Sequence, residues 1–302
     1  SPAPLTRSEV GRLVQSLGRQ RENLHAVLGH AHGMFELRRE RTVARHRGPA
    51  IGQHLHAVTA QIDHRLDGEE HAGTQHRAFA RPAEMQDVGG VVKNASDAVA
   101  AEINARHGAG TAIAVAANIS SKEGLQHLVD ETRRAFGKIT ALVCNAASNP
   151  YYGPSAGIAD DQFRKIMDNN ILSNHWLIHM VAPEMTARGE GSITIISSIG
   201  GLKGSTVIGA YCISKAADMQ MARNLADEFG PQGVRINCIA PGIIRTDFAR
   251  ALWENPDTLA RSTARSPLRR IGEPEEIAGA AVFLASRAGG FTTGQTFVID
   301  GG

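Results

Sequence analysis

The sequence has few of the features that mark specialised classes of protein. Of its 302 residues, 5% are aromatic and three are cysteines, and 32 basic residues nearly cancel 30 acidic ones, for a net charge of +2. It contains no apolar run of about 18 residues, the length that a bilayer-spanning helix needs. These counts exclude disulfide-scaffold, collagen and disordered classes, and they provide no global field to attract nucleic acid or an anionic membrane. We expect a soluble protein with neither partner.

Targeting and metal-binding signals are also scarce. The first residues, SPAPLTRSEVGRL, carry charges that interrupt each apolar stretch, so they do not look like a secretory signal and we expect a cytoplasmic protein. Cys144, Cys212 and Cys238 stand in apolar runs without CxxC or another ligand spacing. We interpret them as small buried side chains in a reducing compartment, and we predict no metal site.

Short apolar runs alternate with helical patterns from about residue 95 onward. The runs are rich in Val and Ile and predict buried strands at 111–119, 139–145, 191–197, 233–240 and 293–300. Segments with 3.6-residue periodicity predict helices at 96–107, 121–136, 160–188, 210–229 and 274–286. This succession predicts an α/β fold of the Rossmann-like kind, a doubly wound parallel sheet with helices on both faces.

Residues 1–94 have a different composition and a weaker pattern. They hold nine of the thirteen His and twelve Arg but a single Lys. A helix at 10–28 and weak strands at 56–62 and 87–93 are the best predictions, so we expect an irregular or helical region with a boundary near residue 94. It is either a divergent or disordered native segment or a shifted or opposite reading frame joined to residues 95–302. Arg and His enrichment with almost no Lys is typical of off-frame GC-rich DNA and favours the second explanation.

Tyr211 and Lys215 stand four residues apart at the start of a predicted helix, so their side chains share one face. An ammonium group near a phenol stabilises the phenolate, which would lower the tyrosine pKa from about 10 and suit it to general acid/base work. The YxxxK pattern alone is also compatible with an ordinary surface pair. Ser198 raises its significance, because its strand would end at the edge of the sheet where open α/β folds bind ligands.

Five motifs together resemble the short-chain dehydrogenase/reductase family over about residues 95–302. They are the NAA of residues 145–147, Ser198, YxxxK at Tyr211 to Lys215, PGxIxT at 241–246 and the closing IDGG. The segment 149–154, with the Ala-Leu-Trp of 251–253, looks like the carbonyl-reductase branch that includes dehydrogenase/reductase 4. This likeness implies that the two segments form the substrate pocket and that their aromatic residues favour an apolar carbonyl substrate. The alternative for these aromatic residues is packing without ligand contact.

The resemblance implies an NAD- or NADP-dependent oxidoreductase that interconverts a small carbonyl and an alcohol. It implies that Tyr211 exchanges the hydroxyl proton, Ser198 binds the carbonyl, Lys215 holds the nicotinamide ribose and Asn170 anchors a relay water. The cofactor-binding residues that it implies are Asn118, Asn145, Tyr211, Lys215, Pro241, Gly242, Ile244 and Thr246. It also implies a homo-oligomer, a homotetramer that pairs the helices at 160–188 and 210–229.

The family's TGxxxGxG phosphate loop has no counterpart in this sequence. The nearest approach is GPAIGQH at 48–54, which has His54 in place of the third glycine and no apolar strand before it. The first two strands are also unrecognisable, and in the doubly wound order they would separate 111–119 from 139–145. The resemblance therefore predicts a truncated domain with a gap in its sheet and weak or no dinucleotide binding.

The sequence is also compatible with other functions. A 3-oxoacyl-carrier-protein reductase is the rival substrate class, and an inactive dehydrogenase-like scaffold is a second class of function. A binding module is the third, because the HxH pairs at 30–32 and 54–56 and the Arg-rich run at 38–47 could hold a metal or phosphates. These signals are weak, since HxH residues do not share a helix face and no aromatic residues interleave the run.

Overall fold

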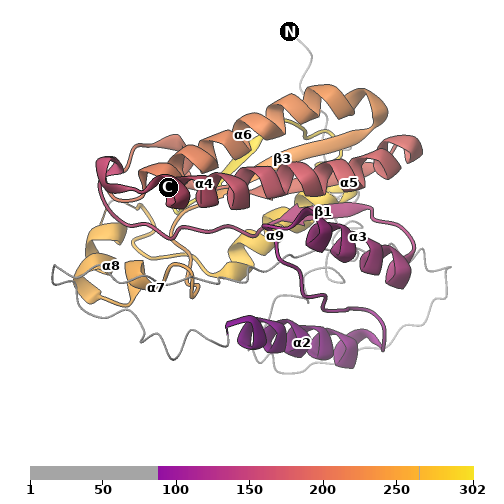
Figure 1. Cartoon of the computed structure of the whole chain (residues 1–302), viewed down its shortest axis with the longest axis horizontal. Coiled ribbons are helices and arrows are strands. Elements are labelled where there is room, and N and C mark those ends of the chain that lie inside the picture. Colours follow the sequence, from indigo (N-terminus) through magenta and orange to yellow (C-terminus); the bar gives the residue numbers. More distant parts are fainter. Residues whose placement is uncertain (1–87, 265) are drawn as a thin grey trace, which may run out of the picture.

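The computed structural model describes residues 88–264 and 266–302, which form layers around a parallel sheet (Figure 1). Several of the sequence predictions lie outside the described residues. These are the helix at 10–28, the strand at 56–62, the glycine-containing stretch at 48–54, the HxH pairs and the Arg-rich run.

Four parallel strands form the sheet in the order β1-β2-β3-β4. They are β1 (Ala141–Cys144), β2 (Gly191–Ile196), β3 (Val234–Pro241) and β4 (Thr296–Ile299). Each overlaps a predicted strand, because continuous apolar runs bounded by turn residues suit strands that are covered on both faces. Parallel strands place their carboxyl ends at one edge, so Cys144, Ile196 and Pro241 lie along the same side of the molecule.

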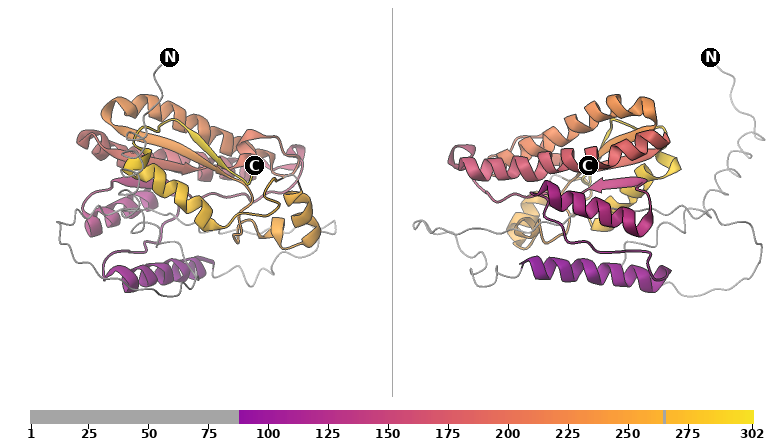
Figure 2. Two further views of the ribbon diagram at one scale, coloured as in Figure 1. Left: turned by 180° about the vertical axis from the view of Figure 1, so that it is seen from behind. Right: turned by 45° about the vertical axis from the view of Figure 1, so that its right-hand side comes forward.

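Helices cover both faces of this sheet, which confirms the doubly wound α/β prediction (Figures 1 and 2). The helices α5 and α6 pack on one face and α9 packs on the other, while α3 packs against α5. The bounds are α2 (Val88–His107), α3 (Lys122–Phe136), α4 (Asp160–Met167), α5 (Ser173–Arg188), α6 (Gly209–Phe229), α7 (Arg250–Trp253), α8 (Pro256–Thr263) and α9 (Pro274–Ala285). The predicted helix 160–188 is α4 and α5 joined through one π-helical turn, Asp168–Leu172.

The predicted strand at 111–119 is wrong. Residues 112–118 have no regular secondary structure, although Val115 and Ala117 pack against the core and Ile119 is buried within it. A strand needs a neighbour to accept its backbone hydrogen bonds, and among the described residues none lies between this segment and β1. The apolar pattern thus predicts burial correctly at Ile119 but not along the whole segment, since Ile113 is 40% exposed.

The weak strand prediction at 87–93 is also wrong, because residues 88–93 belong to α2. This helix begins before the predicted start at residue 96 and crosses the boundary expected near residue 94. In both Figure 1 and Figure 2 it lies apart from the layered sheet. The domain boundary itself stays a prediction.

One apolar core joins the sheet to the helices. It contains Ile193 and Ile195 of β2, Ile236 of β3, Val181 of α5 and Leu125 of α3, all fully buried. All three cysteines are buried and free, as their apolar surroundings predict. No helix in the described part of the chain is long and apolar enough to cross a membrane.

Replacement of Ile193 by alanine should destabilise the protein by about 2–5 kcal/mol, because it leaves a cavity at the centre of the sheet. Urea unfolding followed by circular dichroism measures the change in the free energy of unfolding. The control is Val298→Ala on β4, since the Val298 side chain is 49% exposed. Equal losses for the two variants would contradict this placement of the core.

Candidate active site

A π-helical turn presents Asn170 to the interior. In the turn the N–H of Ser173 bonds to the carbonyl of Asp168, five residues earlier, and the extra residue changes which side chains face inward. The Asn170 amide is fully buried: its Oδ1 accepts from the N–H of Ser148 at 2.7 Å, and its Nδ2 donates to the Ser148 carbonyl at 3.0 Å and to Ser214 Oγ at 2.9 Å. Asn170 therefore fixes the loop after β1 to helix α6.

Ser198 and Tyr211 come from adjoining segments at the carboxyl edge of the sheet. Ser198 follows β2 and caps a short turn through the N–H of Gly200. The turn approaches α6 closely at Gly201, where an added Cβ would lie 2.7 Å from the N atom of Ala216. Glycine is needed there because a side chain would force the turn and helix apart.

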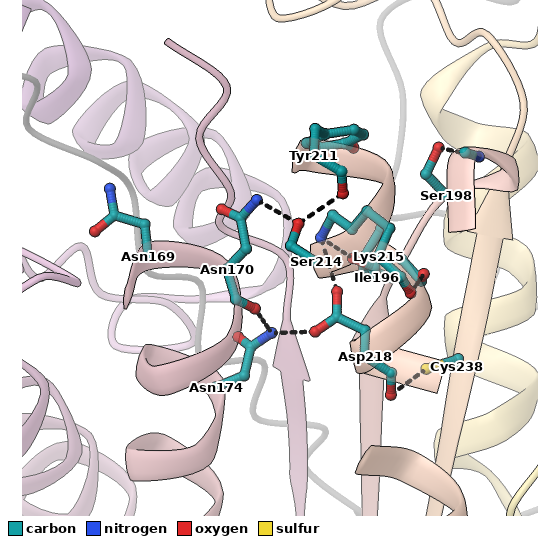
Figure 3. A network of polar contacts seen from close by, with 12 residues as sticks. Asn169, Asn170, Asn174, Ile196, Ser198, Tyr211, Ser214, Lys215, Asp218 and Cys238 are labelled. Carbon is teal, nitrogen blue, oxygen red and sulfur yellow. Dashed lines mark hydrogen bonds and ion pairs between the residues drawn. The ribbon is translucent and has the colours of Figure 1, made fainter. Parts of the chain in front are cut away.

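The ammonium of Lys215 is buried beneath Tyr211 (Figure 3). Its Nζ donates to the Ile196 carbonyl at 2.9 Å and to Asp218 Oδ2 at 3.0 Å, and it lies 5.7 Å from the centroid of the Tyr211 ring. Tyr211 and Lys215 therefore lie on one face of α6, as predicted. The same strand carbonyl that ends β2 helps to hold the lysine.

The pKa of Tyr211 departs from the sequence expectation. Burial raises this pKa, and it outweighs the opposing effects of the Lys215 charge and of hydrogen bonding with Ser198, so the pKa lies above its ordinary value. The lysine thus acts in the predicted direction, but the predicted net lowering of the pKa is wrong. In this structure the phenol is held as a proton donor at neutral pH.

Sequence reasoning missed Asn174 and Asp218. Asp218 is fully buried, and its Oδ1 accepts from Asn174 Nδ2 at 3.0 Å. The same amide nitrogen donates to the backbone carbonyl of Asn170 at 2.8 Å. The signal was available, since Asp218 follows Lys215 by three residues and Asn174 follows Asn170 by four, spacings that share a helix face.

The other predicted cofactor residues lie at the same edge or close to it. Asn145 follows β1 and is exposed, while Pro241 ends β3. Gly242 packs so closely on the last strand that an added Cβ would lie 2.7 Å from Asp300 Cα. Beyond it, Ile244 pairs with Gly272, and Thr246 Oγ1 caps the next turn through the N–H of Ala249.

Asn118 stands apart from this group, because it precedes α3 and does not follow a strand of the sheet. It is exposed before α3, where its Oδ1 accepts from the N–H of Ser120 and shapes the turn into the helix. The structure gives this side chain a local turn role. Its predicted contact with adenine stays a prediction.

Aromatic residues border Tyr211 and the neighbouring loop. The ring of Phe248, 53% exposed, lies 6.1 Å from the Tyr211 ring, centroid to centroid. The polar groups of two predicted pocket residues bond to nearby backbone instead: Tyr151 Oη to the Pro154 carbonyl and Trp253 Nε1 to the Thr246 carbonyl. Phe248, which the sequence analysis did not single out, is therefore an exposed apolar side chain beside the Tyr211 ring.

Comparisons with known proteins identify the family of this chain. A family model described as enoyl-(acyl carrier protein) reductase matches residues 77–302. Dehydrogenase/reductase SDR family member 4 of Bos taurus is 38% identical over 185 residues, which are 61% of this chain and 66% of that protein. The chain belongs to the short-chain dehydrogenase/reductase family. It spans just under two thirds of the length of this relative.

Solved structures of the family share the fold. The 7α-hydroxysteroid dehydrogenase complexed with NADH and 7-oxo glycochenodeoxycholic acid is 33% identical, with a TM-score of 0.66, over 70% of this chain and 81% of that one. ElxO with NADP bound is 27% identical, with a TM-score of 0.58, over 61% of this chain and 75% of that one. Both of these neighbours were solved with a nicotinamide dinucleotide bound.

The residues of this short-chain dehydrogenase/reductase fit the nicotinamide ribose end of such a cofactor. A lysine ammonium has three N–H groups, and the described residues accept from two of those of Lys215, which leaves one donor for a ribose hydroxyl. The described part of the chain offers no glycine-rich loop for the pyrophosphate end. No group of three or more His, Cys, Asp or Glu that could hold a metal occurs among these residues either.

Replacement of Asn170 by alanine should cost about 2–4 kcal/mol of stability, because it leaves the buried N–H and C=O of Ser148 without partners. Urea unfolding measures the loss. Asn224→Ala on the exposed face of α6 is the control and should change the free energy of unfolding little. Equal stability of the Asn170 variant and the parent chain would contradict the role of Asn170 in holding this loop.

Proposed function

We propose that this chain catalyses hydride transfer between NAD or NADP and a small carbonyl or alcohol, with Tyr211 as the acid/base. The observation that carries the proposal is the placement of Tyr211 over the buried ammonium of Lys215, next to Ser198. A bound nicotinamide supplies the hydride. The substrate belongs to the carbonyl-reductase class, because Phe248 offers an apolar surface beside the phenol.

In the direction of reduction, the Ser198 hydroxyl donates a hydrogen bond to the carbonyl oxygen and orients it. Tyr211 Oη donates its proton to that oxygen as the alcohol forms. The Lys215 ammonium stabilises the phenolate that remains. In the direction of oxidation the phenolate takes the proton back. Asn170 holds the loop after β1 and α6 in register, and assembly as a homotetramer through α4, α5 and α6 stays a prediction.

A 3-oxoacyl-carrier-protein reductase is the alternative substrate class. The description of the matching family model, enoyl-(acyl carrier protein) reductase, supports the carrier-protein part of this alternative only, because an enoyl reductase acts on a C=C bond and not on a carbonyl. An acyl thioester would present a carbonyl to the same Ser198 and Tyr211 hydroxyls. Parallel assays with an acetoacetyl thioester and with small ketones and diketones distinguish the two classes.

Replacement of Tyr211 by phenylalanine should lower kcat by a factor of about 10²–10⁴, because it removes the group that exchanges the proton. Oxidation of NADPH and NADH is followed by absorbance with the ketone and thioester panel. The control is Gln126→Ala on the exposed face of α3, away from the site, which should leave kcat unchanged. Retention of most of the rate by the Tyr211 variant would remove the residue from this role.

Isothermal titration with NADPH and NADH tests whether the chain holds the cofactor. The sequence lacks a TGxxxGxG loop, so we expect binding weaker than micromolar. Micromolar binding would refute this expectation. Absence of both binding and turnover would favour the second candidate function, an inactive dehydrogenase-like scaffold.

A further inference from the structure

A buried carboxylate stands behind the catalytic pair. The Asp218 side chain is 0% exposed, that of Lys215 is 2% exposed, and Asp218 Oδ2 lies 3.0 Å from Lys215 Nζ. Charged side chains are seldom buried unless they are paired, since removal from water is costly. The close pairing of the two charges is therefore what allows both side chains to be buried at this site.

Asp218 is held from two sides. Its Oδ2 accepts from Lys215 on its own helix, and its Oδ1 accepts from Asn174 of α5. Asn174 is fixed in turn by the carbonyl of Asn170 at the π-helical turn (Figure 3). The carboxylate thus has a defined position relative to the strand, the two helices and the phenol.

We propose that Asp218 is a positioning residue that draws the Lys215 ammonium against the Ile196 carbonyl and offsets its charge at the Tyr211 hydroxyl. The inference rests on the proposed function of Tyr211. It adds a group that decides how strongly the lysine favours the phenolate, and hence at which pH the tyrosine changes from proton donor to proton acceptor.

The charges around Tyr211 support this role. Burial has the largest effect and raises its pKa; the Lys215 charge and Ser198 lower it, and Asp218 and Cys212 raise it. Lys215 itself stays protonated: burial has the largest effect and lowers its pKa, but Asp218, Tyr211 and Cys238 together raise the pKa above its ordinary value. Asp218 therefore opposes the one cation that stabilises the phenolate.

Among residues 88–264 and 266–302, the groups that face the pair from other elements are uncharged at neutral pH. The thiols of Cys144 on β1 and Cys238 on β3 lie near Asp218 and Lys215, and burial raises the pKa of both, so they are neutral. The Arg223 charge lowers the pKa of Cys238, but this effect is smaller than that of burial. From α5 the facing group is the uncharged amide of Asn174.

Titration of the tyrosinate absorbance in the protein without dinucleotide tests the proposal. The Tyr211→Phe variant identifies the contribution of Tyr211. Asp218→Asn keeps the side-chain shape and removes the charge. The Ile196 carbonyl and the side-chain amide oxygen at position 218 can still accept from Lys215 and keep the ammonium charged, so we expect the midpoint of Tyr211 to move to lower pH. Asp218→Glu, which restores the charge, should move it back, and Asp227→Asn on the exposed part of α6 should leave it unchanged.

An unchanged Tyr211 midpoint in a folded Asp218→Asn variant would overturn the proposal, even if its melting temperature fell, because a purely structural ion pair predicts that combination. A shift of equal size in Asp227→Asn would also overturn it, since the effect would then be one of overall charge. Circular dichroism establishes that each variant is folded.

A second comparison applies if Asp218→Asn does not fold. Lys215→Met/Asp218→Asn replaces the buried pair by uncharged groups, an exchange that proteins often tolerate. Compared with Lys215→Met alone, the double variant should titrate Tyr211 at lower pH. Equal midpoints, or a higher one in the double variant, would overturn the proposal.

The titration separates this proposal from the proposed function because it requires neither cofactor nor turnover. A lowered midpoint in a protein that shows no activity would support the role of Asp218 and contradict the proposed reaction. In an active protein, the Asp218→Asn variant should in addition shift the rate profile for alcohol oxidation to lower pH, because the phenolate is the base in that direction.

Discussion

The burial of one ammonium group organises the candidate active site. Lys215 has left water, and the loss of hydration is offset only because a strand carbonyl and a carboxylate meet its N–H groups at close range. These partners come from β2 and α6, and the carboxylate depends in turn on α5. The mutual placement of these elements is thus a condition for the lysine to lie beneath the tyrosine at all.

The catalytic and phosphate-binding ends of the family's site differ in what supports them. Ser198, Tyr211 and Lys215 stand on elements that share a closed apolar core, which includes β2, β3, α5 and α6. Their arrangement therefore depends on a core that the described residues form themselves, Leu125 of α3 included. The phosphate end depends on a loop for which the sequence has no recognisable counterpart. A chain can for this reason hold the proton-transfer geometry independently of its affinity for dinucleotide.

Local patterns predicted much of this fold, since apolar runs and helical periodicity are properties of neighbouring residues. Such patterns could not show that 111–119 forms no strand, because strand formation depends on a partner that is distant in the chain. The spacing of Tyr211 and Lys215 predicted a shared face. Spacing could not show that burial would dominate the tyrosine pKa, or that Asp218 would be enclosed rather than solvated, because both depend on packing of α6 against β3 and α5.

The π-helical turn at Asp168–Leu172 makes the length of this segment as important as its chemistry. Each residue in an α-helix turns the chain by about 100°. A deletion of one residue here would restore regular α-helical winding, in which each N–H bonds to the carbonyl four residues earlier. The wide turn that presents Asn169 and Asn170 to the interior would then be lost, although both side chains could remain in the sequence. The number of residues in this segment is therefore a requirement of the site in its own right.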